Sequence, residues 1–434
     1  MTADFRTAPV DAASAAALAD DKLRYELVDT KDPVAFRHWL SAVGRGFHDP
    51  AGDADSAELR RFAYLERRAV GVWDDTLSDA PTPVGTLGSW VTDLTVAGEA
   101  SIPAWAISAV TVAPTHRRRG IARSLMEGEL RTAKALGIPA AILTASEATI
   151  YERWGFSPAA MMAEWEIDVA RAKWSGAIPG GRVQLVTTEQ LRDHDGPAIL
   201  ERARLAVPGQ IRFWGILWDR LFGLPSDDAA KSARCVRYDD EHGTPQGFAI
   251  YRPDRGEAEG KLSLGYLIGA TDDAYSALWR YLLQVDLITT ITASLRPVDE
   301  PFRWQVADFR AVKKTWESDH LWLRILDPRA VLEARRYSAP GRFRLTVTDP
   351  LGFATGDYLL EVDADGVGLV SDGDAPDAAG VALSVNELAA ISLGAVSATT
   401  LAKAGRILEQ TPSAAVAVDR AFASPVAPWL SIWF

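Results

Sequence analysis

The sequence predicts a three-part protein of mixed α/β and α+β class, in which two related α/β units precede an α+β domain. Its 434 residues would fill about three domains at roughly 150 residues each. A strand–turn–helix pattern near residues 109–135 returns in weaker form near residues 262–285, and from residue 316 onward short alternating strands replace it. We therefore place the units at residues 1–163, 164–315 and 316–434.

The segment from Ala109 to Ala122 is predicted to bind an anion. Val110 and Val112 are β-branched and alternate with smaller residues, as expected of a half-buried strand. A run of three arginines and a glycine at 117–120 then precedes a helix with apolar residues at three- and four-residue steps. A helix start offers unpaired backbone N–H groups and a positive dipole end, and a glycine there allows a phosphate to approach closely. The alternative is a solvated basic turn before an ordinary helix.

Composition narrows the classes of function. The net charge of −12 argues against a nucleic-acid partner, because phosphate binding needs a basic surface. No apolar run of about 18 residues occurs, so no membrane span is expected, and the first residues lack the pattern of a secretory signal. The six histidines show no metal-ligand spacing, so no metal is expected. The single cysteine, Cys235, indicates a reducing, cytoplasmic location and is interpreted as buried filler in a strand.

In the first unit, strands and helices follow one another as in an α/β domain. Residues 1–22 show no clear period. Asp32 and Pro33 open a helix, and a second, charged helix is expected at 57–68. Strands are expected at residues 25–28, 70–73, 84–90, 105–112 and 140–144.

A short helix that contains Tyr151 is expected after the strand at 140–144. Ser146 is placed to cap the start of this helix, and Gly155 is placed to end it. The capping role of Ser146 does not exclude a ligand contact. From the residues alone, Tyr151 packs under the sheet.

The second unit repeats the pattern without its arginines. Strands at 183–186, 247–251 and 262–268 and a helix at 274–285 are expected. Where the first unit has the arginine run, the second has Ala-Thr-Asp-Asp at 270–273. Two carboxylates would repel a phosphate at close range, so the second unit is predicted to be structural and to bind no coenzyme.

The third unit combines short strands and helices, and it ends in an apolar tail. Strands are expected at 343–348, 358–362, 367–370 and 381–384, and helices near 331–334, 386–392 and 399–406, with Ser384 as a cap. The tail from Trp429 to Phe434 is apolar throughout, so we expect it to dock as a strand. Its end carries a carboxylate of reference pKa about 3.5. The alternative is that the tail only fills an edge of the core.

These features together resemble the Eis (enhanced intracellular survival) family of acetyltransferases, which belongs to the GNAT superfamily. The resemblance covers nearly the whole chain in collinear order. It is carried by 109–122 and by the segments Ala145–Gly155, Leu321–Arg324, Leu332–Arg335 and Ala421–Ser424. It implies two fused GNAT domains, the second degenerate, then a domain like sterol carrier proteins, assembled as a homohexamer. It also implies acetyl transfer from acetyl-CoA to amines of aminoglycosides and other amine-bearing molecules.

The resemblance also assigns roles to individual residues. Tyr151 would act as the general acid, and the terminal carboxylate of Phe434 would deprotonate or orient the amine. The residues implied to hold acetyl-CoA are Val110 and Val112 at the pantetheine arm and acetyl carbonyl, Arg117, Arg118, Gly120 and Ala122 at the pyrophosphate, and Ser146 near the thioester.

Two departures from the family pattern lie in the implied amine pocket. Ala109 stands where the family often has an aromatic residue, and Trp433 stands where well-known members have an acidic one. The pocket should therefore be less anionic and differently shaped, which bears on aminoglycosides more than on acetyl transfer. Phe47 and Asp49 would supply a wall and a charge, and otherwise Asp49 is a turn residue.

The expected substrate is a primary amine of a cationic small molecule, which is aminoglycoside-like, a polyamine or lysine-like. Two other classes of function stay open. One is a carrier of a hydrophobic ligand that uses the C-terminal domain, and the other is a protein that binds acetyl-CoA without transferring the acetyl group.

Overall fold

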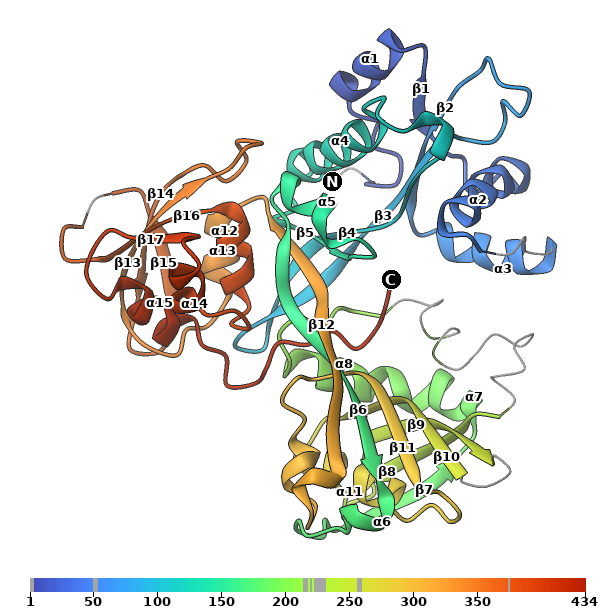
Figure 1. Ribbon diagram of the computed structural model, residues 1–434, viewed down its shortest axis with the longest axis vertical. Helices are drawn as coiled ribbons and strands as arrows, with labels where there is room; N and C mark the ends of the chain where they lie inside the picture. Colours follow the sequence, from blue (N-terminus) through green and yellow to red (C-terminus); the bar gives the residue numbers. More distant parts are fainter. Residues whose placement is uncertain are drawn as a thin grey trace.

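The computed structural model describes residues 4–49, 54–213, 218, 221, 232–255, 260–373 and 375–434. Figure 1 shows three lobes, with the C-terminal domain set against the middle of a long sheet that runs through the other two. Among the described residues, that sheet has 12 strands in the order β1-β2-β3-β4-β5-β12-β6-β11-β10-β9-β8-β7. A separate five-stranded sheet has the order β15-β14-β13-β16-β17.

The first unit contains the strands and helices that the sequence predicts, together with one helix and one strand, β6, that it did not predict. The strands are β1 (Arg24–Leu27), β2 (Arg68–Trp73), β3 (Gly85–Val96), β4 (Ala100–Val112), β5 (Ala140–Thr144) and β6 (Ser157–Asp168). The helices are α1 (Ala12–Asp20), α2 (Pro33–Phe47), α3 (Ala54–Tyr64), α4 (Ile121–Ala135) and α5 (Ala148–Tyr151). The unpredicted helix is α1, which Asp11 caps and which packs against α4.

The helix expected at 57–68 ends at Tyr64, because Arg68 already belongs to β2. The Arg68 side chain is fully buried and forms an ion pair of 2.9 Å with Glu129 of α4. Ser89 of β3 donates a hydrogen bond of 2.7 Å to the other oxygen of Glu129. Arg68 and Ser89 therefore attach β2 and β3 to α4 through the buried carboxylate of Glu129.

The described part of the second unit contains β7 (Arg182–Val186), β8 (Arg234–Asp239), β9 (Pro245–Arg255), β10 (Gly260–Gly269), β11 (Thr290–Arg296) and β12 (Val312–Ile325), with α6 (Val169–Ala172), α7 (Thr188–Gln190), α8 (Gly196–Leu205) and α11 (Asp272–Leu282). The last strand of the second unit, β12, lies between β5 and β6 of the first unit. In turn, β6 of the first unit lies between β12 and β11 of the second. Each unit thus lends a strand to the other. The boundaries placed at 163/164 and 315/316 fall inside these exchanged strands.

The third unit is the α+β domain that the sequence predicts. Its elements are α12 (Pro328–Ala334), β13 (Gly341–Thr348), β14 (Gly356–Val362), β15 (Gly368–Ser371), β16 (Ala379–Ser384), α13 (Val385–Ser392), α14 (Ala398–Lys403), β17 (Ile407–Glu409) and α15 (Ala414–Phe422). Ser384 caps α13, as expected, in a capping box with Glu387. Helix α13 is buried along its whole length and packs against β6 and β12 of the exchanged sheet.

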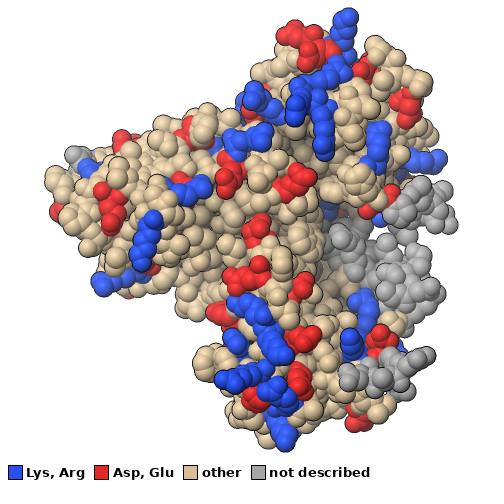
Figure 2. All heavy atoms as spheres, in the orientation of Figure 1, with Lys and Arg blue, Asp and Glu red and all other residues tan. Residues whose placement is uncertain are grey.

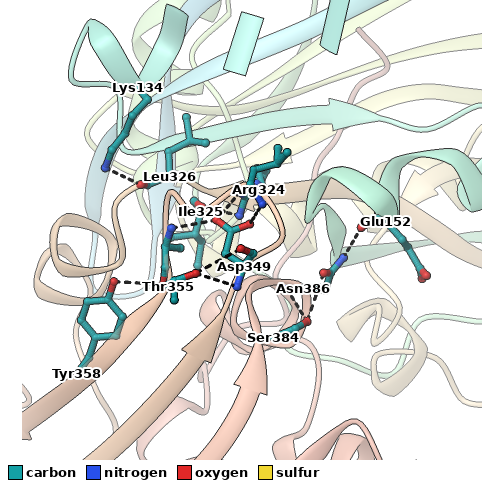
Figure 3. A network of polar contacts seen from close by, with 12 residues as sticks. Lys134, Glu152, Arg324, Ile325, Leu326, Asp349, Thr355, Tyr358, Ser384 and Asn386 are labelled. Atoms are coloured by element: carbon teal, nitrogen blue, oxygen red, sulfur yellow. Dashed lines mark hydrogen bonds and ion pairs between the residues drawn. The ribbon is translucent and has the colours of Figure 1, made fainter. Parts of the chain in front are cut away.

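A buried polar network joins the third unit to the first (Figure 3). Arg324 at the end of β12 forms an ion pair of 2.7 Å with Asp349, and neither side chain is exposed. Lys134 of α4 donates to the carbonyl of Leu326 at 2.7 Å. Asn386 of α13 donates to the carbonyls of Glu152 and Phe156, on either side of the turn that follows Tyr151. The third unit therefore braces the segment that carries Tyr151.

We expect Asp349→Ala to destabilise the protein by about 3–5 kcal/mol, because it leaves the buried Arg324 guanidinium without its counter-charge. The midpoint of thermal unfolding measures this loss. Arg342→Ala, which breaks the exposed ion pair between Arg342 and Asp377, is the matched control and should hardly move the midpoint. Equal shifts in the two variants would contradict the role given to the buried pair.

Candidate active site

A bulge in β4 opens the sheet of the first unit. The register of β3 and β4 shifts between Thr86 and Gly88, and opposite this shift Ala109 has a φ of 54°, in the left-handed region that disfavours a residue with a Cβ. The Thr86 hydroxyl donates to the Ala109 carbonyl at 2.8 Å and lies 2.7 Å from the Thr111 hydroxyl. Since Thr86 has one proton to give, Thr111 donates to Thr86. Side chains thus hold the bulge in place.

Beyond the bulge, β4 and β5 separate. They pair in parallel only from Ala104 to Ala106, opposite 140–142. The backbone of β4 past Ala106 therefore has no strand partner on that side among the described residues. Val110 and Val112 lie on this free edge and are half-buried. Unpaired N–H and C=O groups at such an edge are available to a ligand.

A cavity of about 140 Å³ lies in the opening between the two strands. It brings together seven of the residues selected from the sequence: Phe47, Ala109, Val110, Ser146, Tyr151, Trp433 and Phe434. Ile107, Ser108, Leu143 and Thr144 complete its walls. Asp49 is not among these lining residues and lies exposed just beyond the end of α2. The walls of the cavity are thus mainly apolar.

Tyr151 lies at the end of α5 with its ring among Trp154, Phe156 and Trp322. Burial, helped by the charge of Glu147, raises the pKa of Tyr151 to about 12. The hydroxyl therefore stays protonated at neutral pH and can donate a proton or a hydrogen bond. No described residue hydrogen-bonds to it. This leaves the hydroxyl free for a ligand in the cavity.

The expected capping role of Ser146 is wrong. The cap position of α5 is Glu147, whose side chain makes no capping hydrogen bond, because the helix begins one residue later than predicted. Ser146 instead lines the cavity. Gly155 ends the segment with a φ of 84°, as the sequence predicts. A Cβ there would lie 2.8 Å from Arg324, so only glycine fits.

The start of α4 presents an open, positively charged surface. Gly120 is the cap residue, with a φ of 74°, and a Cβ there would meet no atom within 4 Å. Arg117 and Arg118 are exposed and make no ion pair with any described residue. Ala122 is half-buried in the first turn of the helix. Figure 2 shows Lys and Arg side chains gathered over α4 on the visible face of the first unit.

The third arginine of the run is used differently. Arg119 lies 3.4 Å from the carboxylate of Asp74 and donates at 2.8 Å to the carbonyl of Asp21. His116, which is buried, lies 3.1 Å from the same carboxylate. Hydrogen bonds from Thr76 and then from His116 hold the pKa of Asp74 well below its usual range. No pattern in the sequence pointed to this network, which holds the loop while its first two arginines are exposed to solvent.

The tail docks at the cavity, but the prediction that it docks as a strand is wrong. Residues 423–434 are irregular, and side chains bind their backbone. Thr144 of β5 donates at 2.9 Å to the main-chain oxygen of Phe434. The ring of Phe434 lies edge-on to that of Trp90, with 5.3 Å between the ring centres. His320 of β12 lies 2.8 Å, through Nε2, from the Ile432 carbonyl. No strand forms in this segment, because these main-chain oxygens accept from the side chains of Thr144 and His320 instead of from the backbone of a neighbouring strand.

Family models match three parts of the chain. Two GNAT acetyltransferase domain models match residues 31–159 and 215–325, and a sterol carrier protein domain model matches residues 328–431. With the opened sheet of the first unit, these matches define the class: the chain is a GNAT acetyltransferase with two GNAT domains and a sterol-carrier-like domain.

Individual relatives narrow the class to one family. The N-acetyltransferase Eis of Mycobacterium bovis (strain BCG / Pasteur) is 36% identical over 339 residues, which cover 77% of this chain and 81% of that protein. An uncharacterised N-acetyltransferase of Streptomyces avermitilis is 36% identical over 90% of this chain and 94% of its own length. The crystal structure of Eis1 from Mycobacterium abscessus covers 95% of this chain with a TM-score of 0.79 and 27% identity. The chain belongs to the Eis family of N-acetyltransferases.

The described residues contain neither a membrane-spanning helix nor a cluster of metal-ligating side chains. No helix in these ranges is long and apolar enough to cross a bilayer. Within the same ranges, no three His, Cys, Asp or Glu side chains gather as a metal site would require. Cys235 is buried, as expected, and burial raises the pKa of its thiol.

His320 should make the stability of the protein depend on pH. Burial lowers the pKa of His320 to about 4, against about 6.5 in an unfolded chain. Between these pH values the unfolded chain binds a proton that the folded chain does not. The contribution of His320 to the free energy of unfolding is therefore complete above pH 6.5 and falls as the pH drops toward 4. The loss at pH 4 is about 3 kcal/mol.

We expect His320→Gln, which keeps an N–H for the Ile432 carbonyl, to reduce the change in the thermal unfolding midpoint between pH 6.5 and pH 4. The exposed His242→Gln is the control and should keep the slope of the unchanged protein. A slope in His320→Gln as steep as that of the control would contradict this assignment.

Proposed function

We propose that the first unit transfers the acetyl group of acetyl-CoA to a primary amine of a cationic small molecule, which is aminoglycoside-like, a polyamine or lysine-like. The observation that supports this most strongly is the cavity between β4 and β5. Tyr151 and Phe434 both line this cavity, so the Tyr151 hydroxyl can serve as the acid there and the carboxylate of Phe434 as the base. An acid and a base thus face one small space at the free edge of a strand.

Acetyl-CoA lies, in this proposal, along the opening of the sheet. The backbone of Val110 and Val112 binds the pantetheine arm and the acetyl carbonyl, in place of the missing strand pairing. Arg117, Arg118 and the backbone N–H groups from Gly120 to Ala122 bind the pyrophosphate. Ser146 lies near the thioester. The exposure of the two arginines, and the open space above Gly120, favour this arrangement.

The transfer step needs a neutral amine. The Phe434 carboxylate takes the proton of the amine, directly or through water, and the amine nitrogen attacks the thioester carbon. A backbone N–H of β4 stabilises the oxyanion, the C–N bond forms, and the C–S bond breaks. Tyr151 donates its proton to the sulfur as negative charge develops there, and the second proton, which the nitrogen loses once the C–N bond has formed, restores the Tyr151 hydroxyl through water. Holding both reactants in one cavity supplies much of the rate.

The walls of the cavity set the choice of amine. Phe47, Ala109 and Trp433 contribute no negative charge, so the terminal carboxylate is the main anion that faces the substrate. Asp49 adds charge only outside these walls. We therefore propose that smaller amines, or amines with an apolar part, bind better than heavily charged aminoglycosides.

The remaining assignments follow the family resemblance. We propose units at 1–163, 164–315 and 316–434, of which the second binds no coenzyme, and a cytoplasmic homohexamer without nucleic-acid, membrane or metal partners. In the second unit, Asp272 and Asp273 lie in the first turn of α11, the turn that in α4 directly follows the arginine loop and Gly120. Two acids at that position disfavour a pyrophosphate.

A panel of polyamines, lysine analogues and aminoglycosides, assayed by release of the coenzyme A thiol, tests the function. Release with at least one amine is expected. If acetyl-CoA binds and no amine supports release, the protein is an acetyl-CoA-binding protein. If acetyl-CoA does not bind and lipid co-purifies, it is a carrier.

We expect the double variant Arg117→Ala/Arg118→Ala to raise the Kd of acetyl-CoA on the order of ten- to a hundredfold, because two charge-assisted contacts to phosphate are lost. Isothermal titration measures the Kd. Arg119→Ala is the matched control, since that side chain binds Asp74 and Asp21, and should lower the unfolding midpoint more than the affinity. Equal Kd values in the two variants would argue against the phosphate site.

Tyr151→Phe should lower kcat by about a hundredfold or more while the Kd of acetyl-CoA changes little, because only the proton donor is removed. Because burial raises the pKa of Tyr151 to about 12, its ionisation should not reduce the rate of the unchanged protein up to pH 10. Steady-state rates over pH 6–10 measure both effects. A wild-type kcat in Tyr151→Phe would remove Tyr151 from the mechanism.

A further inference from the structure

The second unit keeps the opening that the first unit uses. Strands β10 and β11 pair in parallel only from Lys261 to Leu264, opposite 290–293. The register of β10 with β9 shifts just beyond Leu264, as in a bulge. Leu295 of β11 has a φ of 54°. The two strands therefore separate as β4 and β5 do.

Arg296 of β11 closes the inner part of this second opening. Its guanidinium donates to the Leu267 carbonyl of β10 at 2.7 Å and so bridges the separated strands. Glu300 holds the same guanidinium with bonds of 2.8 and 3.1 Å and also accepts from the Tyr275 hydroxyl. All of these side chains except Tyr275 are nearly inaccessible to solvent. The Arg296 side chain thus occupies the inner part of the opening.

The C-terminal tail closes the outer part. The indole of Trp429 lies against the Arg296 guanidinium at 5.0 Å, and its Nε1 donates to the Leu295 carbonyl at 2.7 Å. The Trp429 amide donates to the carbonyl of Pro208 at 2.9 Å. The tail thus binds the second unit through both its backbone and its side chain.

Ser431 adds a second attachment. Its hydroxyl donates to Gln210 at 2.8 Å and lies 3.1 Å from the Tyr266 hydroxyl of β10, so Tyr266 donates to Ser431. Gln210 also donates to the Trp429 carbonyl at 2.9 Å. Gln210, Ser431 and Trp429 are all buried. Each of these polar side chains has a partner, which favours one fixed position of the tail.

The tail touches equivalent positions of both openings. Leu295 stands two residues beyond the last parallel pair of β10 and β11, as Thr144 stands two residues beyond the last pair of β4 and β5. Trp429 is bonded to the first of these residues and Phe434 to the second. Figure 1 shows the dark-red tail crossing from the C-terminal domain to end between the two units.

We propose that the opening of the second unit is a clamp for the chain's own tail, and that Trp429 and Tyr266 are positioning residues for the Phe434 carboxylate. The catalytic part of this inference rests on the function proposed above. Five residue steps span at most about 18 Å, so fixing Trp429 limits where the carboxylate can lie. The second unit thereby takes part in catalysis at the first without binding acetyl-CoA.

Carboxypeptidase A tests the clamp without reference to activity. The peptidase must detach the tail before it can release free phenylalanine from position 434. Trp429→Phe and Tyr266→Phe each remove one hydrogen bond of the clamp and should speed this release on the order of fivefold. The matched control is Tyr251→Phe, which removes a partly buried hydroxyl that lies 2.8 Å from the Tyr281 hydroxyl, away from the tail.

Release at the wild-type rate in both clamp variants would overturn the proposal. Equal acceleration in Tyr251→Phe would overturn it as well, since the effect would then be general loosening of the second unit. Faster release in the clamp variants alone supports it.

Kinetics test the positioning role. The clamp variants should lower kcat severalfold with the KM of acetyl-CoA unchanged, whereas Tyr251→Phe should change neither. A chain extended by one glycine beyond Phe434, which moves the carboxylate, should lose most of its kcat. If the extension abolishes turnover and the clamp variants do not lower it, positioning is wrong and the proposed function stands. If the extension keeps full kcat, the role of the carboxylate in the proposed function is wrong, and the positioning role fails with it.

Discussion

The exchange of β6 and β12 is the constraint on which the arrangement of the active site depends. Because each strand lies in the hydrogen-bonded sheet beside the other unit, the two GNAT units form one continuous sheet and cannot rotate against each other as linked domains do. The buried pair of Arg324 and Asp349 and the contacts of Asn386 attach the third unit to the same strands. A tail anchored on the second unit therefore reaches a fixed place in the first.

Local sequence signals predicted the elements of the site well. Alternating valines, a proline, a glycine and an amphipathic run indicated β4, the loop and α4, and their apolar face is buried as expected. Asp32, Ser384 and Gly155 fixed the ends of helices at the positions proposed for them. These signals involve residues within a few positions of one another, which is why one sequence suffices to find them.

Contacts between segments that are far apart in the chain could not be predicted from the sequence. Asp74 and His116 are far apart in the chain, and neither residue carries a pattern that pairs it with the other. The tail was expected to dock because it is apolar, but its conformation depends on side chains of Gln210, Tyr266 and His320 from other elements. The wrong prediction for Ser146 has the same cause. Ser146 lines the cavity in the opened sheet and does not cap α5, and the sequence near Ser146 does not reveal that opening.

The position of β12 beside β5 also determines the order in which the sheet can form during synthesis. Thr144 of β5 pairs with Leu321 of β12, so one edge of β5 has no partner until the ribosome has made the later strand. At about 5–20 residues per second, the roughly 180 residues in between take on the order of ten to forty seconds to synthesise. During that interval the nascent chain carries an apolar strand with a bare edge beside the future active site, and this edge is where mispairing or a chaperone would first engage it.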